Sequence, residues 1–140
     1  MTESMETAVI RHRLVECLRL VAADASEQCS AFPKGVFAPD EVALLFEDAH
    51  SLASDRGEEL GLDAEVVRIV AQIDTQFAAR SGSRETVWSV GAMKSDPFWE
   101  QQRELARVAL KLADEPERRP ALDWVHYIPG PDNSLDEQGD

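Results

Sequence analysis

The sequence has little cysteine and no long apolar run. Its two cysteines, Cys17 and Cys29, have no CxxC spacing, so we expect a reduced, cytoplasmic setting, with a disulfide between them left open as an alternative. No run of about 18 or more apolar residues is present, which argues against a membrane-spanning helix. Residues 1–13 carry early acids and no apolar stretch before a cleavage site, so they do not read as a secretory signal.

Familiar catalytic motifs are also missing, including HExxH, GxSxG, the P-loop and GxGxxG. The three histidines, His12, His50 and His126, fall on separate predicted elements, which argues against a zinc site or a catalytic triad. Residues 47–50 match the Glu-x-x-His half-motif of di-iron bundles, but helical geometry places Glu47 on the outer face. We therefore expect no metal, no cofactor and no enzymatic activity.

The charge balance is strongly acidic and unevenly distributed. The chain has 27 acids and 14 bases, for a net charge of −13. Residues 40–65 hold nine acids and a single base, Arg56, and residues 132–140 hold four acids and no base. Such a field repels nucleic acid and anionic membranes and attracts basic proteins. We expect no direct binding to either, and an acidic surface that serves only solubility stays open as an alternative.

Apolar residues that recur at three- and four-residue steps predict an all-α fold, a single-domain bundle of four main helices. The first helix covers residues 3–28, with Cys17 in its buried stripe. The second has Asp40 as N-cap and stops near Gly57, and the third has Asp63 as N-cap and ends at residues 81–83.

The fourth helix has the clearest boundaries. Asp96 is the expected N-cap, Pro97 follows in the first turn, and the helix runs to about residue 113. On its predicted outer face a basic stripe recurs every four residues, and we expect it to pair with the acids of the second helix within the fold or across a dimer. Contact with an anionic ligand is the alternative. The stripe consists of Arg103, Arg107 and Lys111.

Two segments remain ambiguous. Residues 84–95 fit either a short helix or a packed loop, and residues 121–128 fit one or two helical turns or an edge strand that docks on the bundle. The predicted domain organisation is a helical domain over 1–131 and a disordered acidic tail over 132–140.

The acidic hairpin of residues 40–65 is the leading candidate for a functional surface, because its net charge complements a basic surface of another protein. Trp99 is added as an interface aromatic, because it lies about 100° around its helix from Phe98 and both cannot be centred on the core. We expect it at least partly exposed or under residues 84–95. The predicted partner-contact residues are Glu47, Asp48, Asp55, Glu58, Glu59 and Trp99.

In size, charge and helical class the chain resembles bacterial toxin-immunity proteins and other small protein inhibitors. That resemblance implies an inhibitor whose partner is a basic protein, such as a toxin or a nucleic-acid-acting enzyme. One alternative is a small-ligand-binding protein or enzyme with a pocket near the fourth helix; a second is a structural subunit that forms a homodimer through a helix face. The ligand pocket would be lined by Trp88, Met93, Trp99 and Trp124, with Arg103 or Arg107 at its mouth.

Overall fold

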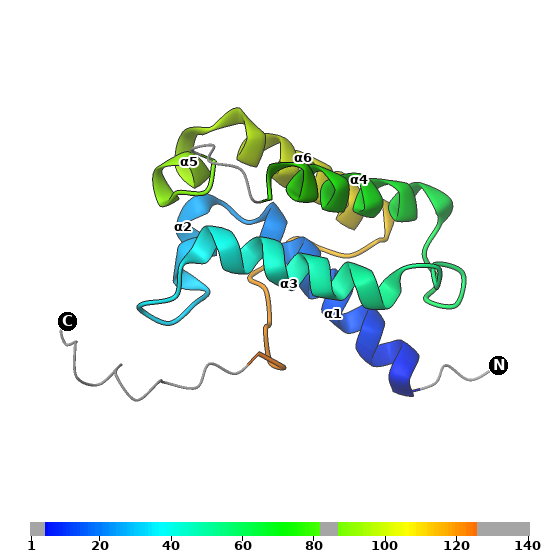
Figure 1. Cartoon of the computed structure of the whole chain (residues 1–140). Helices are drawn as coiled ribbons and strands as arrows, with labels where there is room; N and C mark the ends of the chain where they lie inside the picture. The colour runs from blue at the N-terminus through cyan, green and yellow to red at the C-terminus, as the bar shows by residue number, and fades with distance from the viewer. Residues whose placement is uncertain (1–4, 82–86, 126–140) are drawn as a thin grey trace.

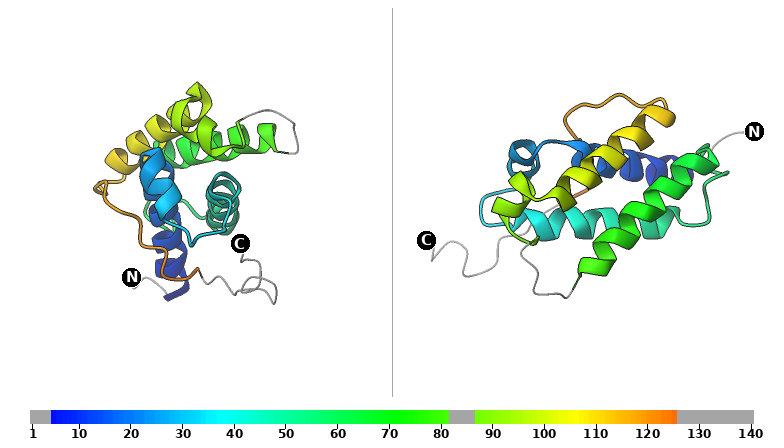
Figure 2. Two further views of the ribbon diagram at one scale, coloured as in Figure 1. Left: turned by 90° about the vertical axis from the view of Figure 1, so that its left-hand side faces the viewer. Right: turned by 90° about the horizontal axis from the view of Figure 1, so that it is seen from above.

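The computed structural model describes residues 5–81 and 87–125, and all regular structure within these residues is helical (Figure 1). The long helices α1, α3, α4 and α6 form a ring in which each packs on two others, with α1 and α3 in one layer and α4 and α6 in the second (Figure 2). The predicted all-α bundle of four main helices is thereby confirmed. The helices are α1 (Met5–Ala22), α2 (Ala25–Ser30), α3 (Ala38–Ala53), α4 (Ala64–Arg80), α5 (Val90–Ser95) and α6 (Pro97–Leu112).

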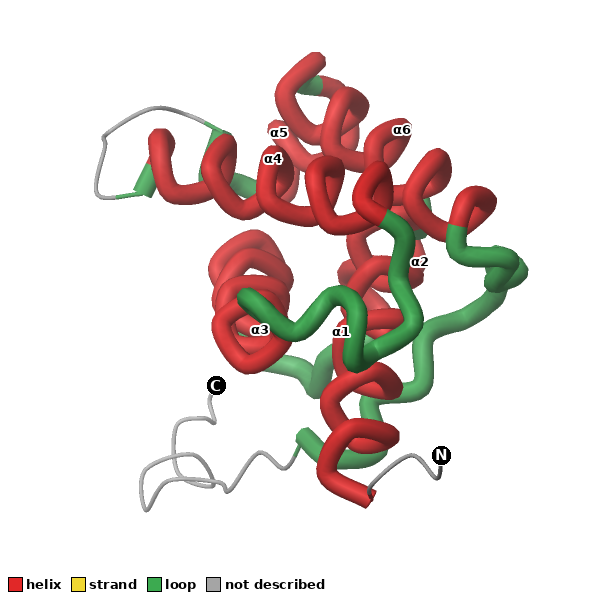
Figure 3. Tube along the Cα trace, turned by 90° about the vertical axis from the view of Figure 1, so that its right-hand side faces the viewer, coloured by secondary structure: helices red, strands yellow, loops and turns green. Residues whose placement is uncertain are grey.

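The central helix is α1, which contacts both α3 and α6. Its predicted apolar stripe is buried, as expected, but so is every residue from 14 to 23. Glu16 and Arg19, which periodicity assigns to the polar side, are only 1% and 3% exposed. The reason is a segment that follows α6, residues 113–125, which we call the C-terminal strap; it runs along α1 on the side that α3 and α6 leave open (Figure 3).

A polar network fastens the strap to α1. The carboxylate of Glu16 pairs with Arg19 on the same helix and accepts a hydrogen bond from the backbone N–H of Ala121 at 2.8 Å. The guanidinium of Arg19 donates to the carbonyl of Pro116 and to Glu115, each at 2.9 Å. Because both ionised groups are buried with partners on several sides, they close the strap without leaving an unpaired charge.

The first helix is shorter than predicted. The expected helix over 3–28 is wrong at its C-terminal end, because α1 stops at Ala22 and a separate helix, α2, begins after Asp24. The carboxylate of Asp24 accepts a hydrogen bond from the backbone N–H of Glu27 and starts α2. The side-chain amide of Gln28 then donates to two carbonyls at the end of α1, those of Leu20 and Val21. The break is stable because these groups replace the lost helical hydrogen bonds.

The boundaries of α3 also differ from the prediction. Its N-cap is Phe37 instead of Asp40, which lies in the first turn, where Pro39 costs no hydrogen bond. The helix ends at Ala53, before Gly57, because the C-cap residue Ser54 leaves the helical conformation with ψ 134°; Asp55 then follows in a left-handed conformation with φ 66°. Gly57 serves a different purpose: a Cβ there would lie 2.6 Å from Cγ2 of Val67, so a larger residue would force this partly exposed valine side chain to move.

The remaining long helices, α4 and α6, begin at their predicted N-cap residues, but only one of the two N-caps forms a capping hydrogen bond. Asp63 occupies the N-cap position of α4, but its side chain accepts no hydrogen bond from the helix. Asp96 is the N-cap of α6 and accepts from the backbone N–H of Phe98 at 2.8 Å. In the segment 84–95, for which the sequence left a short helix or a loop open, the described residues 87–95 contain a short helix, α5. The hydroxyl of Ser89 caps it by accepting a hydrogen bond from the backbone N–H of Ala92.

The basic stripe of α6 is not the outer face that the pattern predicted. Arg103 is only 5% exposed, while the apolar Val108 is 46% exposed. Arg107 pairs with Glu104 and Glu117 and not with the acidic face of α3. The helix is rotated relative to the prediction because Trp99 and Gln102, instead of Val108, occupy the core.

Within the described residues, the strap contains a turn from Leu122 to Val125 and docks Trp124 against α1. The alternative of an edge strand over 121–128 finds no support in residues 121–125, which form no strand. Residues 126–128 and the predicted acidic tail over 132–140 lie outside the described residues. None of the described helices combines the length and apolar character needed to cross a membrane.

Candidate partner-binding surface

The predicted acidic contacts lie on α3 and on the loop that joins it to α4. All five, Glu47, Asp48, Asp55, Glu58 and Glu59, are exposed. The first two sit on α3 and the other three on the loop, so the structure places them as two groups separated by roughly 8 Å of helix.

Glu59 differs from the others because it is occupied inside the protein. Its carboxylate accepts a hydrogen bond from the hydroxyl of Thr7 at 3.1 Å and lies 3.6 Å from Arg56. Arg56 also reaches Glu6 at 3.7 Å. These contacts tie the loop to the start of α1, so Glu59 anchors the loop and contributes less free charge to a partner.

The other four predicted acids have no such partner within the described part of the chain. Among the residues that the structure describes, none of the four carboxylates forms an ion pair. We call these residues the acidic face, which consists of Glu47, Asp48, Asp55 and Glu58. Because unpaired exposed carboxylates keep their full field, this face attracts cations more strongly than acids that are already paired.

Trp99 does not belong to this surface. It is completely buried, and its indole N–H donates to the carbonyl of Val87 at 2.7 Å. Of the two expected placements, partial exposure is wrong, and the indole lies under the segment that leads into α5. Trp99 packs among Phe77, Trp88 and Phe98, so it offers no atoms to a partner and leaves the candidate set.

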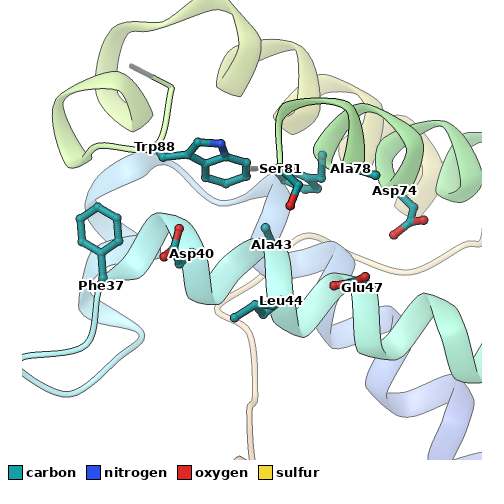
Figure 4. Close-up of a pocket in the computed structure, with 10 residues that line it drawn as sticks. Phe37, Asp40, Ala43, Leu44, Glu47, Asp74, Ala78, Ser81 and Trp88 are labelled. Atoms are coloured by element: carbon teal, nitrogen blue, oxygen red, sulfur yellow. The ribbon is translucent and has the colours of Figure 1, made fainter. Parts of the chain in front are cut away.

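Beside the acidic face, the structure has a feature that sequence reasoning missed. A groove of about 500 Å³ runs between α3 and α4 and ends at Trp88 (Figure 4). Leu44 and Phe37 lie on its α3 side and are 50% and 48% exposed. Ala43 and Ala78 line it as well and leave room between the helices. The sequence offers one signal for the groove: Leu44 is a large apolar residue two positions from the core residues Val42 and Phe46, so on α3 it faces away from them.

Three carboxylates line the same groove: Asp40 and Glu47 from α3 and Asp74 from α4. No lysine or arginine is among its described lining residues. Asp74 lies 3.4 Å from Nδ1 of His50, so its position is set by an internal contact, whereas Asp40 and Glu47 are exposed. The groove thus combines apolar walls with negative charge at several points along its length.

The aromatic end of the groove is rigid. The indole N–H of Trp88 donates to the carbonyl of Arg80 at 2.8 Å, which ties the ring to the end of α4. Its ring also packs on Phe77, with centroids 6.2 Å apart. A ring held at both its polar and its apolar side presents a fixed surface, which lowers the entropic cost of binding against it.

The alternative pocket predicted near the fourth helix is not assembled from its proposed residues. Met93 and Trp99 are fully buried, and Trp124 packs on α1, where its ring lies 5.7 Å from that of His12. Arg103 is buried and donates to the carbonyls of Ala23 and Met93 instead of guarding a mouth. Of this set, Trp88 borders the groove between α3 and α4, and Arg107 lines a separate hollow between α6 and the strap.

Metal binding and thiol chemistry are two further possibilities for the described side chains. Within residues 5–81 and 87–125, no group of three or more His, Cys, Asp or Glu side chains is arranged to hold a metal ion. Cys17 and Cys29 are free thiols. Burial, together with the nearby negative charges of Asp48 and Glu16, raises the pKa of Cys17 to about 12, which leaves it a poor nucleophile.

No family model, curated protein or solved structure matches this chain. The function must therefore be argued from the acidic face, the groove beside it and their chemistry.

Proposed function

We propose that this protein binds a basic surface of a partner protein through the acidic face and acts as an inhibitor or immunity-type protein. The observation that carries the proposal is the set of four exposed carboxylates on α3 and its loop that lack ion pairs among the described residues. Several other acids of the described residues are paired locally, as Glu65 is with Arg68 and Glu104 with Arg107. Charge left unpaired on a rigid helix is available to an incoming cation.

The unpaired carboxylates should affect the association rate and the specificity of binding more than the affinity for the partner. Complementary charge steers a basic protein toward α3, and the effect weakens as salt screens it over about 8–10 Å. An enzyme that acts on nucleic acid carries such a basic surface, since it must hold phosphates. Covering that surface with carboxylates on a helix would block access of the nucleic acid. A cytoplasmic setting belongs to the proposal and is supported by the two free thiols.

The test compares two triple charge reversals that change the net charge equally. The first, Glu47→Lys, Asp48→Lys and Asp55→Lys, inverts the acidic face. The matched control, Glu65→Lys, Glu104→Lys and Glu117→Lys, alters exposed acids that already have arginine neighbours. Each protein serves as bait in its native lysate at low and high salt, retained proteins are identified by mass spectrometry, and the affinity of the purified partner is measured by calorimetry.

The expected result is a basic partner retained by the wild type and by the control, and lost from the first variant. The dissociation constant should rise by about 10- to 100-fold for the face variant, which corresponds to ~1.4–2.8 kcal/mol. Equal losses in both variants would mean that only the total charge matters. Retention of the same partner by all three proteins would overturn the assignment of the surface.

A further inference from the structure

The groove between α3 and α4 has a composition that differs from the rest of the acidic face. The face itself carries carboxylates alone, whereas the groove adds exposed apolar side chains, Phe37 and Leu44, and the edge of a fixed indole, Trp88. Large apolar side chains that are half exposed beside a concave site are the usual components of a recognition pocket. The groove is therefore suited to bind side chains and not only charge.

The charges within the groove indicate that its ligand carries positive charge. Asp40 projects beside the aromatic end, and Glu47 and Asp74 project near one another at the far end (Figure 4). Carboxylates at both ends of an apolar groove complement a ligand that has apolar groups flanked by cations. Arginine and lysine suit this arrangement, because their long apolar stems can lie along Leu44 while the charged heads reach the acids.

The length of the groove indicates a polypeptide segment. From Phe37 to Glu47 the α3 wall rises about 15 Å, at ~1.5 Å per residue. That length matches an extended segment of about five residues, or nearly three turns of a helix. A single small amine could occupy one end of the groove but could not bridge its apolar wall and both acidic ends together.

We propose that this groove binds one amphipathic cationic segment of the partner protein, with an aromatic or aliphatic side chain against Phe37, Leu44 and Trp88 and with lysine or arginine beside Asp40, Glu47 and Asp74. This inference rests on the proposed function and deepens it. The acidic face supplies the long-range attraction, and the groove selects the partner by shape and apolar contact. Since specificity needs contacts that a wrong partner cannot make, the groove distinguishes one basic protein from the many that a negative surface attracts.

The test uses a display library of random peptides of about twelve residues, which is longer than the groove. The library is selected on the wild-type protein and, in parallel, on the double variant Phe37→Ser with Leu44→Ser. Both side chains are about half exposed, so their loss should not unfold the protein. The matched control is Val108→Ser with Leu112→Ser, which removes two similarly exposed apolar side chains from α6.

We expect enriched peptides to combine Lys or Arg with Leu, Phe or Trp, and to bind the groove variant at least about tenfold more weakly than the wild type or the control. Replacing their apolar residues by serine, at unchanged charge, should weaken binding to a similar extent. In ¹⁵N-resolved NMR spectra, the bound peptides should shift the amides of residues 40–47 and 74–81 and the indole signal of Trp88.

Three outcomes would overturn the inference, and they separate it from the proposed function. If cationic peptides are enriched but bind the groove variant equally, the acidic face binds basic partners and the groove does not select among them. If no cationic peptide binds at low salt, both proposals fail. If phenethylamine shifts the groove signals while no peptide does, the site takes a small amine and not a protein segment.

Discussion

The carboxylate of Glu16 on α1 accepts a hydrogen bond from the backbone N–H of Ala121, which lies 105 positions later in the chain. The same carboxylate lies 3.3 Å from Arg118, so one buried acid holds two points of the C-terminal strap. The strap in turn excludes water from Arg19, whose side chain is 3% exposed. Glu16 therefore joins the first helix to the end of the described chain.

Replacing Glu16 by leucine should destabilise the protein by about 3 kcal/mol, since removing one partner of a buried ion pair leaves the other charge uncompensated. Arg19 would keep Glu115 but lose its nearest carboxylate, and the N–H of Ala121 would lose its acceptor. The midpoint of urea denaturation measures the change, and hydrogen exchange should report faster exchange along the strap.

The matched control is Arg118→Ala, which removes the exposed partner of the same carboxylate. Its side chain is 58% exposed, so its loss should cost less than about 1 kcal/mol. A larger loss of stability for Arg118→Ala than for Glu16→Leu would contradict the buried network as the source of the strap's attachment.

A second prediction concerns Arg103, which joins α6 to α5 and to the junction between α1 and α2. Its guanidinium donates to the carbonyl of Ala23 at 3.2 Å, to the carbonyl of Met93, and to Glu100 at 3.1 Å. Arg103→Met keeps much of the side-chain volume but leaves two carbonyls without their donor, so we expect a loss of about 3 kcal/mol in the free energy of unfolding.

Arg107→Met is the control for this change, because Arg107 lies one turn along α6 and is partly exposed. In thermal and urea denaturation, the free energy of unfolding of Arg107→Met should lie within about 1 kcal/mol of the wild-type value. Equal stability of the two variants would show that the hydrogen bonds of Arg103 contribute nothing net.

The contrast between these arginines illustrates what local sequence can and cannot predict. Asp96 and Pro97 define a helix start through groups within two residues of each other, so the prediction was confirmed. Which side of α6 faces inward depends on the helices packed against it, and the two choices differ by about one residue, or 100°. Periodicity alone could not decide whether Arg103 or Val108 would be buried.

The same limit applies to α1 and to the groove. Glu16 is buried because a segment about a hundred positions away covers it, and no local pattern contains that information. The acids Glu47 and Asp48 were predicted correctly as exposed, since helical geometry fixes which face they occupy. The groove beside them depends on the spacing between α3 and α4, so its lining by Leu44 and Asp74 became visible only in three dimensions.

A third prediction distinguishes the two thiols. Because burial raises the pKa of Cys17 to about 12, almost none of this thiol is ionised at pH 8, and the folded protein shields it. We expect iodoacetamide to modify Cys29, which is partly exposed, and to leave Cys17 unmodified until urea unfolds the protein. Peptide mass spectrometry resolves the two sites, and the variant Cys29→Ser should take up no label when folded. Rapid labelling of folded Cys17 would contradict its burial.

The last prediction concerns His12 and Asp123, whose Nε2 and Oδ1 atoms lie 2.9 Å apart where the strap meets α1. The hydrogen bond with His12, followed by the charges of His12 and Arg13, holds the pKa of Asp123 below its ordinary value of 3.8. A carboxylate with a lowered pKa in the folded state contributes stability that is complete above the unfolded value. This contribution should therefore be present above pH 3.8 and be lost as the pH falls through the lower pKa of the folded state.

The variant His12→Phe tests this, because it keeps a ring that can pack edge-on against Trp124 but removes the hydrogen bond and the charge. Following the carboxyl carbon of Asp123 by NMR through an acid titration, we expect its pKa to rise toward 3.8 in the variant. The exposed residue Lys34 lies outside this contact, so Lys34→Gln should leave the titration unchanged. If His12→Phe also left it unchanged, the hydrogen bond would not be the cause of the lowered pKa, and the end of the strap would be held by the packing of Trp124 alone.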